Sequence, residues 1–118
     1  MRKRKKVDDD PQWWTEAVEL EVADKLTEAE AVIRRALDPR GDPSSAQIAY
    51  LYEVRCRRLI SQGQLDEARK AADKGYRFMC EYASGATSGG EGIALSQEAQ
   101  DYRKTLDRLI KKAISKLS

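Results

Sequence analysis

The chain has 118 residues and a net charge of +2, because 22 basic residues nearly balance 20 acidic ones. It contains no histidine, which excludes His-based acid–base catalysis, Ser-His and Cys-His nucleophile pairs, and metal sites with histidine ligands. Leu, Ile, Val and Phe contribute 22 residues, but 15 alanines accompany them, and the balanced charge favours helices over disorder. The composition therefore predicts a small helical protein that binds a partner and is not an enzyme.

The N-terminal segment is strongly basic, whereas the rest of the chain is slightly acidic. Residues 2–6 carry five positive charges, so the remaining residues carry a net charge of −3. No apolar segment follows this basic block, unlike in a signal peptide, and no apolar run is long enough to span a membrane. Cys56 and Cys80 belong to no CxxC motif and suit buried, reduced positions. We expect a flexible tail over 1–9, a single helical domain over 10–118, and a cytoplasmic location.

Helical spacing of apolar residues predicts five helices and no sheet. Asp10-Pro11 is a typical helix start, because Asp can cap free amides and Pro suits the first turn. It predicts a first helix over about 10–24. Thr27 and Glu30 have the spacing of a capping box, which predicts a second helix over about 28–38. The short connection makes these two helices antiparallel neighbours.

Two prolines and one glycine predict the helix boundaries in the middle of the chain. The segment 38–43 contains two of the three prolines and is predicted to be a loop. A third helix is expected over about 43–62, where Gly63 ends it, and a fourth from about residue 65. The first and second pairs of helices are therefore each joined by a short turn.

Glycines also mark the C-terminal half. Gly75 lies inside the apolar stripe of the fourth helix, where glycine costs about 1 kcal/mol relative to alanine, so we expect another backbone to pack close to it. The Gly-rich segment 84–92 lacks the order of a phosphate-binding loop and predicts a flexible connector, with Thr87 and Ser88 as its polar groups. A long final helix is expected over about 93–116.

The second pair of helices repeats the first at an offset of 39 residues. Aromatic, aliphatic and small residues recur in the same register, and short side chains allow the helices of a hairpin to approach closely. The equivalent residues are Trp13 and Tyr52, Leu20 and Leu59, Ala29 and Ala68, and Ala36 and Gly75.

This pattern resembles the tetratricopeptide repeat, a helix-turn-helix unit of 34 residues with aromatic and small residues at fixed positions. The resemblance covers about residues 11–84 as two degenerate repeats, with the extra residues in the linker. Glu16-Ala17 and Arg55-Cys56 stand where the family has Leu-Gly. The resemblance implies antiparallel hairpins stacked as in that family, a long C-terminal capping helix, and a groove that binds a peptide or a partner helix. An unrelated five-helix bundle is the alternative.

Carried over by register, the resemblance assigns groove positions to Trp14, Val18, Glu21 and Val22 in the first repeat and to Tyr50, Glu53, Arg57, Ile60 and Ser61 in the second. Trp, Tyr and Arg are frequent binding hot spots. Adjacent Trp13 and Trp14 cannot face the same way on a helix, so one is expected in the core. Glu53 and Arg57, four residues apart, also fit a simple surface ion pair. The implied function is protein–protein interaction, as an adaptor, a chaperone or an immunity-type protein.

Two alternatives remain from the sequence. The basic tail and the basic residues of the last helix fit nucleic-acid binding, although the net acidic body disfavours it. A homodimer could form through the last helix, using Leu106, Leu109, Ile110, Ala113 and Ile114. We expect no catalytic residues, no cofactor and no metal site.

Overall fold

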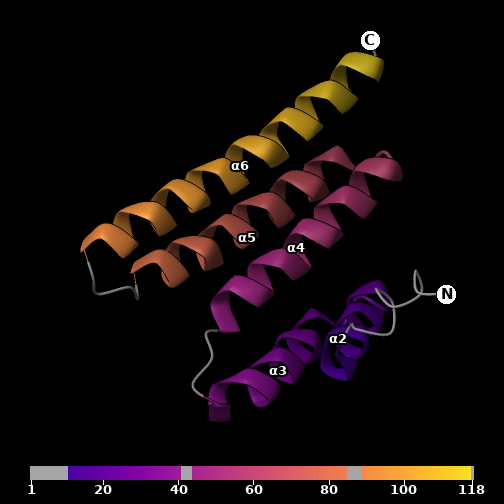
Figure 1. Cartoon of the computed structure of the whole chain (residues 1–118). Coiled ribbons are helices and arrows are strands. Elements are labelled where there is room, and N and C mark those ends of the chain that lie inside the picture. Colours follow the sequence, from indigo (N-terminus) through magenta and orange to yellow (C-terminus); the bar gives the residue numbers. More distant parts are fainter. Residues whose placement is uncertain (1–10, 41–43, 85–88, 118) are drawn as a thin grey trace, which may run out of the picture. The chain divides into compact units, whose positions relative to one another are not determined.

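A computed structural model describes residues 11–40, 44–84 and 89–117 (Figure 1). Its elements are α2 (Gln12–Val22), α3 (Leu26–Leu37), the 3₁₀ turn η2 (Asp38–Arg40), α4 (Ser44–Ser61), α5 (Leu65–Ser84) and α6 (Gly89–Leu117). These ranges contain five α-helices and no strand, so the predicted all-α fold class is confirmed. The predicted flexible tail over 1–9 lies outside the described residues. Backbone contacts divide the chain into two compact units, 1–44 and 45–118.

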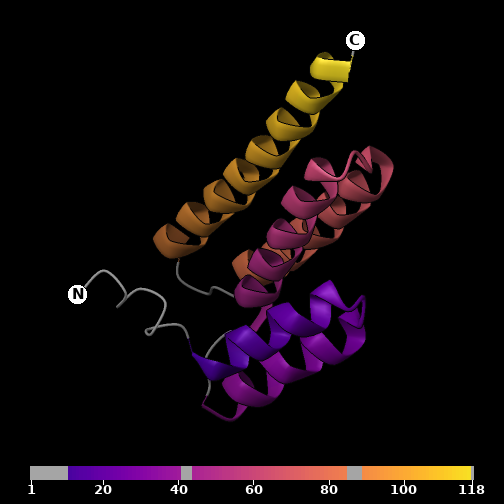
Figure 2. The same ribbon diagram turned by 90° about the vertical axis from the view of Figure 1, so that its right-hand side faces the viewer.

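The first unit is a hairpin of α2 and α3, which lie side by side (Figure 2). Apolar residues on α3 recur at helical spacing, and Ala29 and Ile33 are fully buried. Ala17 on α2 is also fully buried, and its small side chain allows close approach of the two helices. The hairpin therefore follows from the 3.6-residue periodicity of the sequence.

The predicted capping box at the start of α3 is wrong. α3 begins at Leu26, before Thr27, and its N-cap is Lys25, whose side chain makes no capping hydrogen bond. The Lys25 carbonyl oxygen accepts the first bond of the helix, from the Ala29 amide at 3.0 Å. Thr27 therefore lies inside the first turn of α3 and not at its cap. The start of α2 also differs, because Pro11 takes its N-cap position.

The α2–α3 turn has the hydrogen bonds of a Schellman motif. The Lys25 amide donates to the Leu20 carbonyl oxygen at 2.8 Å. The Asp24 amide donates to the Glu21 carbonyl oxygen at 2.9 Å. Asp24 has a φ of 65°, the left-handed conformation that closes this turn.

The α4–α5 turn in the second unit repeats these bonds 39 residues later. The Gln64 amide donates to the Leu59 carbonyl oxygen at 2.9 Å, and the Gly63 amide donates to the Ile60 carbonyl oxygen at 3.0 Å. Gly63 has a φ of 77°, a conformation that glycine adopts without steric cost. The internal repeat seen in the sequence thus corresponds to two turns with the same backbone geometry.

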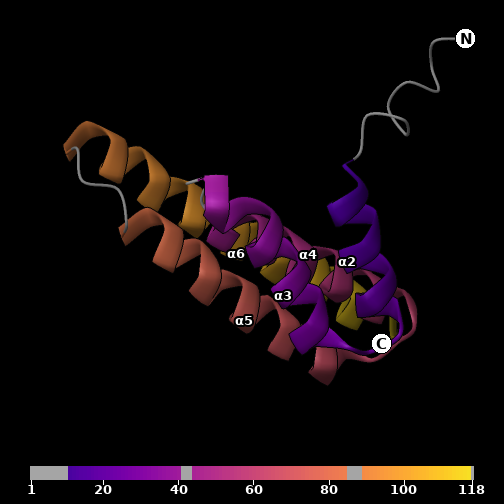
Figure 3. The same cartoon turned by 90° about the horizontal axis from the view of Figure 1, so that it is seen from below.

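In the second unit, α6 packs along α5 (Figures 1 and 3). The guanidinium of Arg103 on α6 is 2.8 Å from a carboxylate oxygen of Asp73 on α5 and also bonds Asp107 on its own helix at 3.2 Å. The same guanidinium lies 5.3 Å from the centre of the Tyr76 ring. These contacts join the two helices outside their apolar seam.

The close approach expected at Gly75 is made by side chains and not by a backbone. A Cβ atom at this position would overlap the hydroxyl of Tyr102 and would lie 3.0 Å from Cβ of Tyr52. The Tyr102 hydroxyl passes over Gly75 and donates a hydrogen bond to the carbonyl oxygen of Ala49 on α4, at 2.5 Å. Glycine is therefore required here to let one α6 side chain contact both α5 and α4.

The Gly-rich connector is shorter than predicted, because α6 begins at Gly89 and α5 extends to Ser84. Gly89 and Gly90 occupy the first turn of α6, where glycine does not carry the cost that it has in a helix interior. Thr87 and Ser88 lie outside the described residues. Among the described helices, none combines the length and apolar character that a bilayer crossing requires.

Candidate functional site

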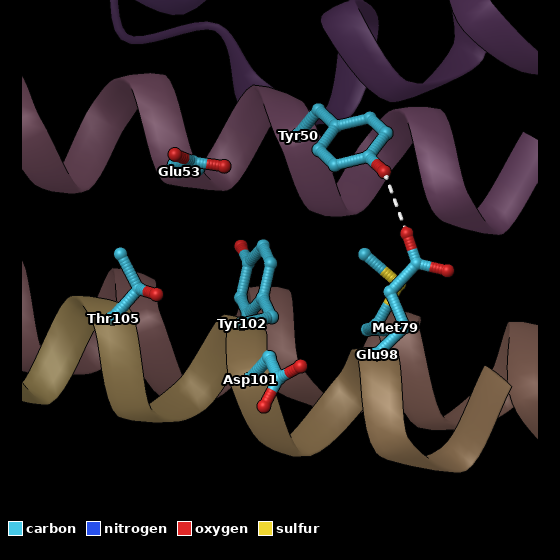
Figure 4. A pocket seen from close by; sticks show the side chains of 7 residues that line it. All are labelled: Tyr50, Glu53, Met79, Glu98, Asp101, Tyr102 and Thr105. Carbon is cyan, nitrogen blue, oxygen red and sulfur yellow. Dashed lines mark hydrogen bonds between the residues drawn. The ribbon is translucent and has the colours of Figure 1, made fainter. Parts of the chain in front are cut away.

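An open pocket of about 190 Å³ lies in the second unit, between α4 and α6 (Figure 4). Its lining combines aromatic, acidic and apolar side chains: Tyr50, Glu53, Met79, Glu98, Asp101, Tyr102 and Thr105. Figure 4 shows Tyr50 and Glu53 on α4 opposite Glu98, Tyr102 and Thr105 on α6, with the Asp101 carboxylate turned away from α4 in this view. The three-residue and four-residue spacings within each helix put these residues on the facing sides of the two helices.

Tyr50 links the two sides of the pocket. Its hydroxyl donates a hydrogen bond to Oε2 of Glu98 at 3.2 Å, shown as a dashed line in Figure 4. Burial raises the pKa of Tyr50 above its ordinary value, and the neighbouring Glu98 carboxylate raises that pKa further. The phenol therefore stays protonated at neutral pH and acts as a hydrogen-bond donor, not as a base.

The floor of the pocket is formed by Tyr102 and Met79. Both are buried, with 7% and 1% of their surface exposed. The Tyr102 hydroxyl points toward α4, where it bonds Ala49. Burial is the main cause of the raised pKa of Tyr102, so this hydroxyl is a fixed structural donor. The floor thus presents an aromatic ring and a thioether, with its one hydroxyl already engaged.

Carboxylates form the rim of the pocket. Glu98 and Asp101 are exposed, and Oδ1 of Asp101 accepts a hydrogen bond from Gln97 at 3.2 Å. Glu53 is paired with Arg57 on the same helix, with Nη2 2.9 Å from Oε2. No basic residue is among those that line the pocket. The described residues contain no group of three or more His, Cys, Asp and Glu side chains placed to hold a metal ion.

The groove residues predicted on α4 fall into two places. Tyr50 and Glu53 line the pocket, and Arg57 lies one turn further along, half exposed and bound to Glu53. Ile60 and Ser61 line a separate cavity at the C-terminal end of α4. The Glu53–Arg57 contact is the surface ion pair that the spacing allowed, so the acidic charge of Glu53 is partly balanced.

The groove residues predicted on α2 have different exposures. Trp14 and Val18 are half-buried, and Val22 is 59% exposed. Glu21 is fully buried, so its side chain does not lie on an exposed surface as a groove contact would. Trp13 and Trp14 are both half-buried and meet edge to face, with ring centres 6.2 Å apart. The expectation that one tryptophan would enter the core is therefore wrong, because both side chains are only partly buried.

Sequence reasoning missed the α6 side of the pocket. The resemblance places Glu98, Asp101 and Thr105 in a capping helix, although they follow one face at intervals of three and four residues. Tyr102 lies within the same stretch and is buried. An aromatic residue among evenly spaced polar residues was the available signal, because it marks where an apolar seam borders a polar face.

The leucine-rich face proposed for a homodimer is largely used within the chain. Leu106 and Ile110 have exposures of 0% and 2%, and Leu109 and Ala113 are half-buried. Ile114, at 37%, is the exposed member of the set. In comparisons with family models, curated proteins and solved structures, no match to this chain was found.

Proposed function

We propose that the chain is a protein-binding module whose pocket between α4 and α6 receives a lysine or arginine side chain of a partner. The observation that supports this proposal is the pairing of a carboxylate rim with an aromatic and apolar floor, without a basic lining residue. A cationic side chain is the partner group that this lining complements.

Each part of the pocket has a role toward such a side chain. Glu98 and Asp101 would accept charge-assisted hydrogen bonds, which are shorter and stronger than neutral ones. The methylene stem of the bound residue would lie against Met79 and Tyr102, since Lys and Arg pack their stems on apolar surfaces. The volume of about 190 Å³ is below the usual range of small-molecule pockets and suits one inserted side chain.

The resemblance to the tetratricopeptide repeat remains part of the proposal, for each hairpin taken by itself. It is supported by the repeated turns and by equivalent buried residues at the 39-residue offset, such as Ala17 and Cys56, and Ala29 and Ala68. An adaptor, chaperone or immunity-type role fits a module of this kind. The free thiols of Cys56 and Cys80 support a reducing, cytoplasmic setting.

The test starts from a random-peptide phage library selected on the purified protein. We expect enrichment of peptides that contain Arg or Lys beside an apolar residue. A selected peptide is then compared with its citrulline analogue, which keeps the shape of arginine and removes its charge. Fluorescence polarisation should show about tenfold tighter binding of the arginine form, equivalent to about 1.4 kcal/mol.

The double variant Glu98→Gln/Asp101→Asn should bring the two peptides to similar affinities. Asp66→Asn is the matched control, because Asp66 is exposed at the start of α5 and does not line the pocket. Equal loss in the control, or an unchanged preference in the double variant, would exclude the pocket as the binding site for the cation.

Nucleic-acid binding is the second candidate function, and the exposed basic residues of α6 favour it. These are Lys104, Arg108, Lys111, Lys112 and Lys116, whereas the basic tail lies outside the described residues. Titration with duplex DNA at two salt concentrations tests this candidate, because phosphate contacts predict a steep loss of affinity at the higher salt. Absence of salt-dependent binding would eliminate it.

A further inference from the structure

A second cavity, of about 520 Å³, lies at the other end of the second unit. It is lined by the end of α4, the α4–α5 turn, the start of α5 and the C-terminal half of α6, through Ile60, Ser61, Gly63, Leu65, Leu109, Lys112, Ala113 and Lys116. We call this cavity the lysine-edged groove. It shares no lining residue with the pocket that contains Tyr50.

The interior of the lysine-edged groove is apolar. Ile60, Leu65 and Leu109 are half-buried residues that leave part of their side chains accessible. Gly63 lies at the turn, and a Cβ atom built there would meet nothing within 4 Å. The turn therefore leaves this end of the groove open, and the accessible aliphatic surface is concave.

The charge at the groove has one sign. Lys112 and Lys116 are exposed and are the charged residues that line it. Arg108 and Lys111 precede them on α6 and are exposed as well. No acidic residue is among the lining residues, so an occupant with carboxylates beside apolar side chains would complement the groove.

We propose that the lysine-edged groove docks an acidic amphipathic helix of another protein. Its aliphatic side chains, one helical turn apart, would enter between Ile60, Leu65 and Leu109, as in other helix-in-groove complexes. Its carboxylates would lie beside Lys112 and Lys116. This interaction goes beyond the proposed function, because it uses a different site and the opposite charge.

Other occupants fit the groove less well. A twofold dimer would bring the same patch of each copy together, so the lysines of both copies would be concentrated at one interface. A small molecule needs several placed polar groups for orientation, and here the uncharged polar side chain is that of Ser61 alone. On the described part of α6, Ile114 is the exposed large hydrophobic residue, at 37%, which is little apolar surface for membrane insertion.

The experiment uses a fluorescein-labelled designed peptide with leucines at i, i+3, i+4 and i+7 and glutamates between them. We expect saturable binding to the full-length protein in fluorescence polarisation. Lys112→Glu/Lys116→Glu should weaken this binding by about tenfold or more, since repulsion replaces attraction at two rim positions. A peptide with lysines in place of the glutamates, and one with alanines in place of the leucines, should bind at least about tenfold more weakly.

Two control variants separate this site from its alternatives. Lys70→Glu changes an exposed lysine on α5 outside the groove and should leave binding of the acidic peptide unchanged. Glu98→Gln/Asp101→Asn should also leave it unchanged, so this proposal and the proposed function can fail independently. Circular dichroism confirms that each variant is folded.

Several outcomes would overturn the proposal. These are an acidic peptide that does not bind, an equal loss of binding in Lys70→Glu, and equal binding of the lysine-containing peptide. Binding to phosphatidylserine vesicles that depends on Lys112 and Lys116, without binding of the peptide, would assign the groove to a membrane surface and overturn it as well.

Discussion

The two hairpins, α2–α3 and α4–α5, close with the same turn, but one of their equivalent positions differs in an informative way. Asp24 and Gly63 occupy the same left-handed position, with φ values of 65° and 77°. Ala36 on α3 and Gly75 on α5 also correspond at the 39-residue offset. Ala36 is half-buried, whereas a Cβ atom at Gly75 would overlap Tyr102 of α6.

The difference between Ala36 and Gly75 shows why the pocket lies in the second hairpin and its α6 neighbour. The repeated residues specify the turns and the seams within each hairpin. The pocket needs in addition an α6 side chain that crosses over α5 at Gly75 and bonds α4 at Ala49. The second hairpin has glycine at position 75, where the first hairpin has Ala36. This glycine makes room for Tyr102, which both packs α6 against the hairpin and lines the pocket with Tyr50.

The largest expected effect is that of Gly75→Ala. Alanine usually stabilises a helix interior by about 1 kcal/mol relative to glycine, but here its Cβ would displace Tyr102. Overpacking typically costs about 1–3 kcal/mol, and loss of the bond to Ala49 adds about 1 kcal/mol. We expect a net loss of about 2 kcal/mol in the free energy of unfolding, measured by urea denaturation.

Two variants separate the effect of helix propensity from that of the contact with Tyr102. Ala36→Gly should lower stability by about 1 kcal/mol, because at the equivalent position of the first hairpin helix propensity acts alone. Tyr102→Phe should partly rescue Gly75→Ala by removing the hydroxyl that the new Cβ meets. Stabilisation by Gly75→Ala would mean that Tyr102 does not pass over this position.

Alkaline pH should destabilise the second hairpin selectively. Burial raises the pKa of the Cys56 thiol from an ordinary value of 9.0 to about 11. Because the folded pKa lies above the unfolded one, the stabilising contribution is complete below pH 9 and is lost as the pH rises from 9 through 11. The loss is at most about 3 kcal/mol, and denaturant melts across this pH range measure it.

Cys56→Ala tests the assignment, because Ala17 is the equivalent residue of the first hairpin and is equally buried. This variant should lose the part of the alkaline dependence that comes from Cys56, while the contributions of other groups persist. An identical pH profile in Cys56→Ala would show that the thiol is not the buried group that titrates.

A smaller effect is expected at the turn. Gly63→Ala should lower the free energy of unfolding by about 1 kcal/mol through backbone strain, since no atom lies near the new Cβ. Gly63→Asp should cost less, because Asp tolerates the left-handed conformation and Asp24 already adopts it in the first turn. Thermal unfolding ranks the two variants, and an equal loss in both would show that φ does not control this position.

Much of the fold could be predicted from the sequence, because its signals are local. Pro39, Pro43 and Gly63 separate the helices, and apolar spacing gives their faces. The helix starts at Leu26 and Gly89 were predicted too late. Capping and glycine signals describe single residues, whereas these starts depend on the geometry of the preceding turn or on position within the first helical turn.

The candidate site was predictable only on α4. Tyr50 and Glu53 were singled out by the resemblance, whereas Glu98 and Asp101 were not, because their place opposite α4 depends on how α6 packs. Glu21 was predicted to line a groove from its position in the repeat, but its side chain is fully buried. Contacts between distant helices depend on packing, which a local pattern does not encode.

The most direct test of this account is a nuclear Overhauser measurement on the labelled wild-type protein. The account predicts strong cross-peaks from the ring protons of Tyr102 to the Hα protons of Gly75, with further cross-peaks to Ala49, because the ring passes over α5 and reaches α4. A Tyr102 ring with cross-peaks to neither residue would contradict both the packing of α6 and the pocket that depends on it.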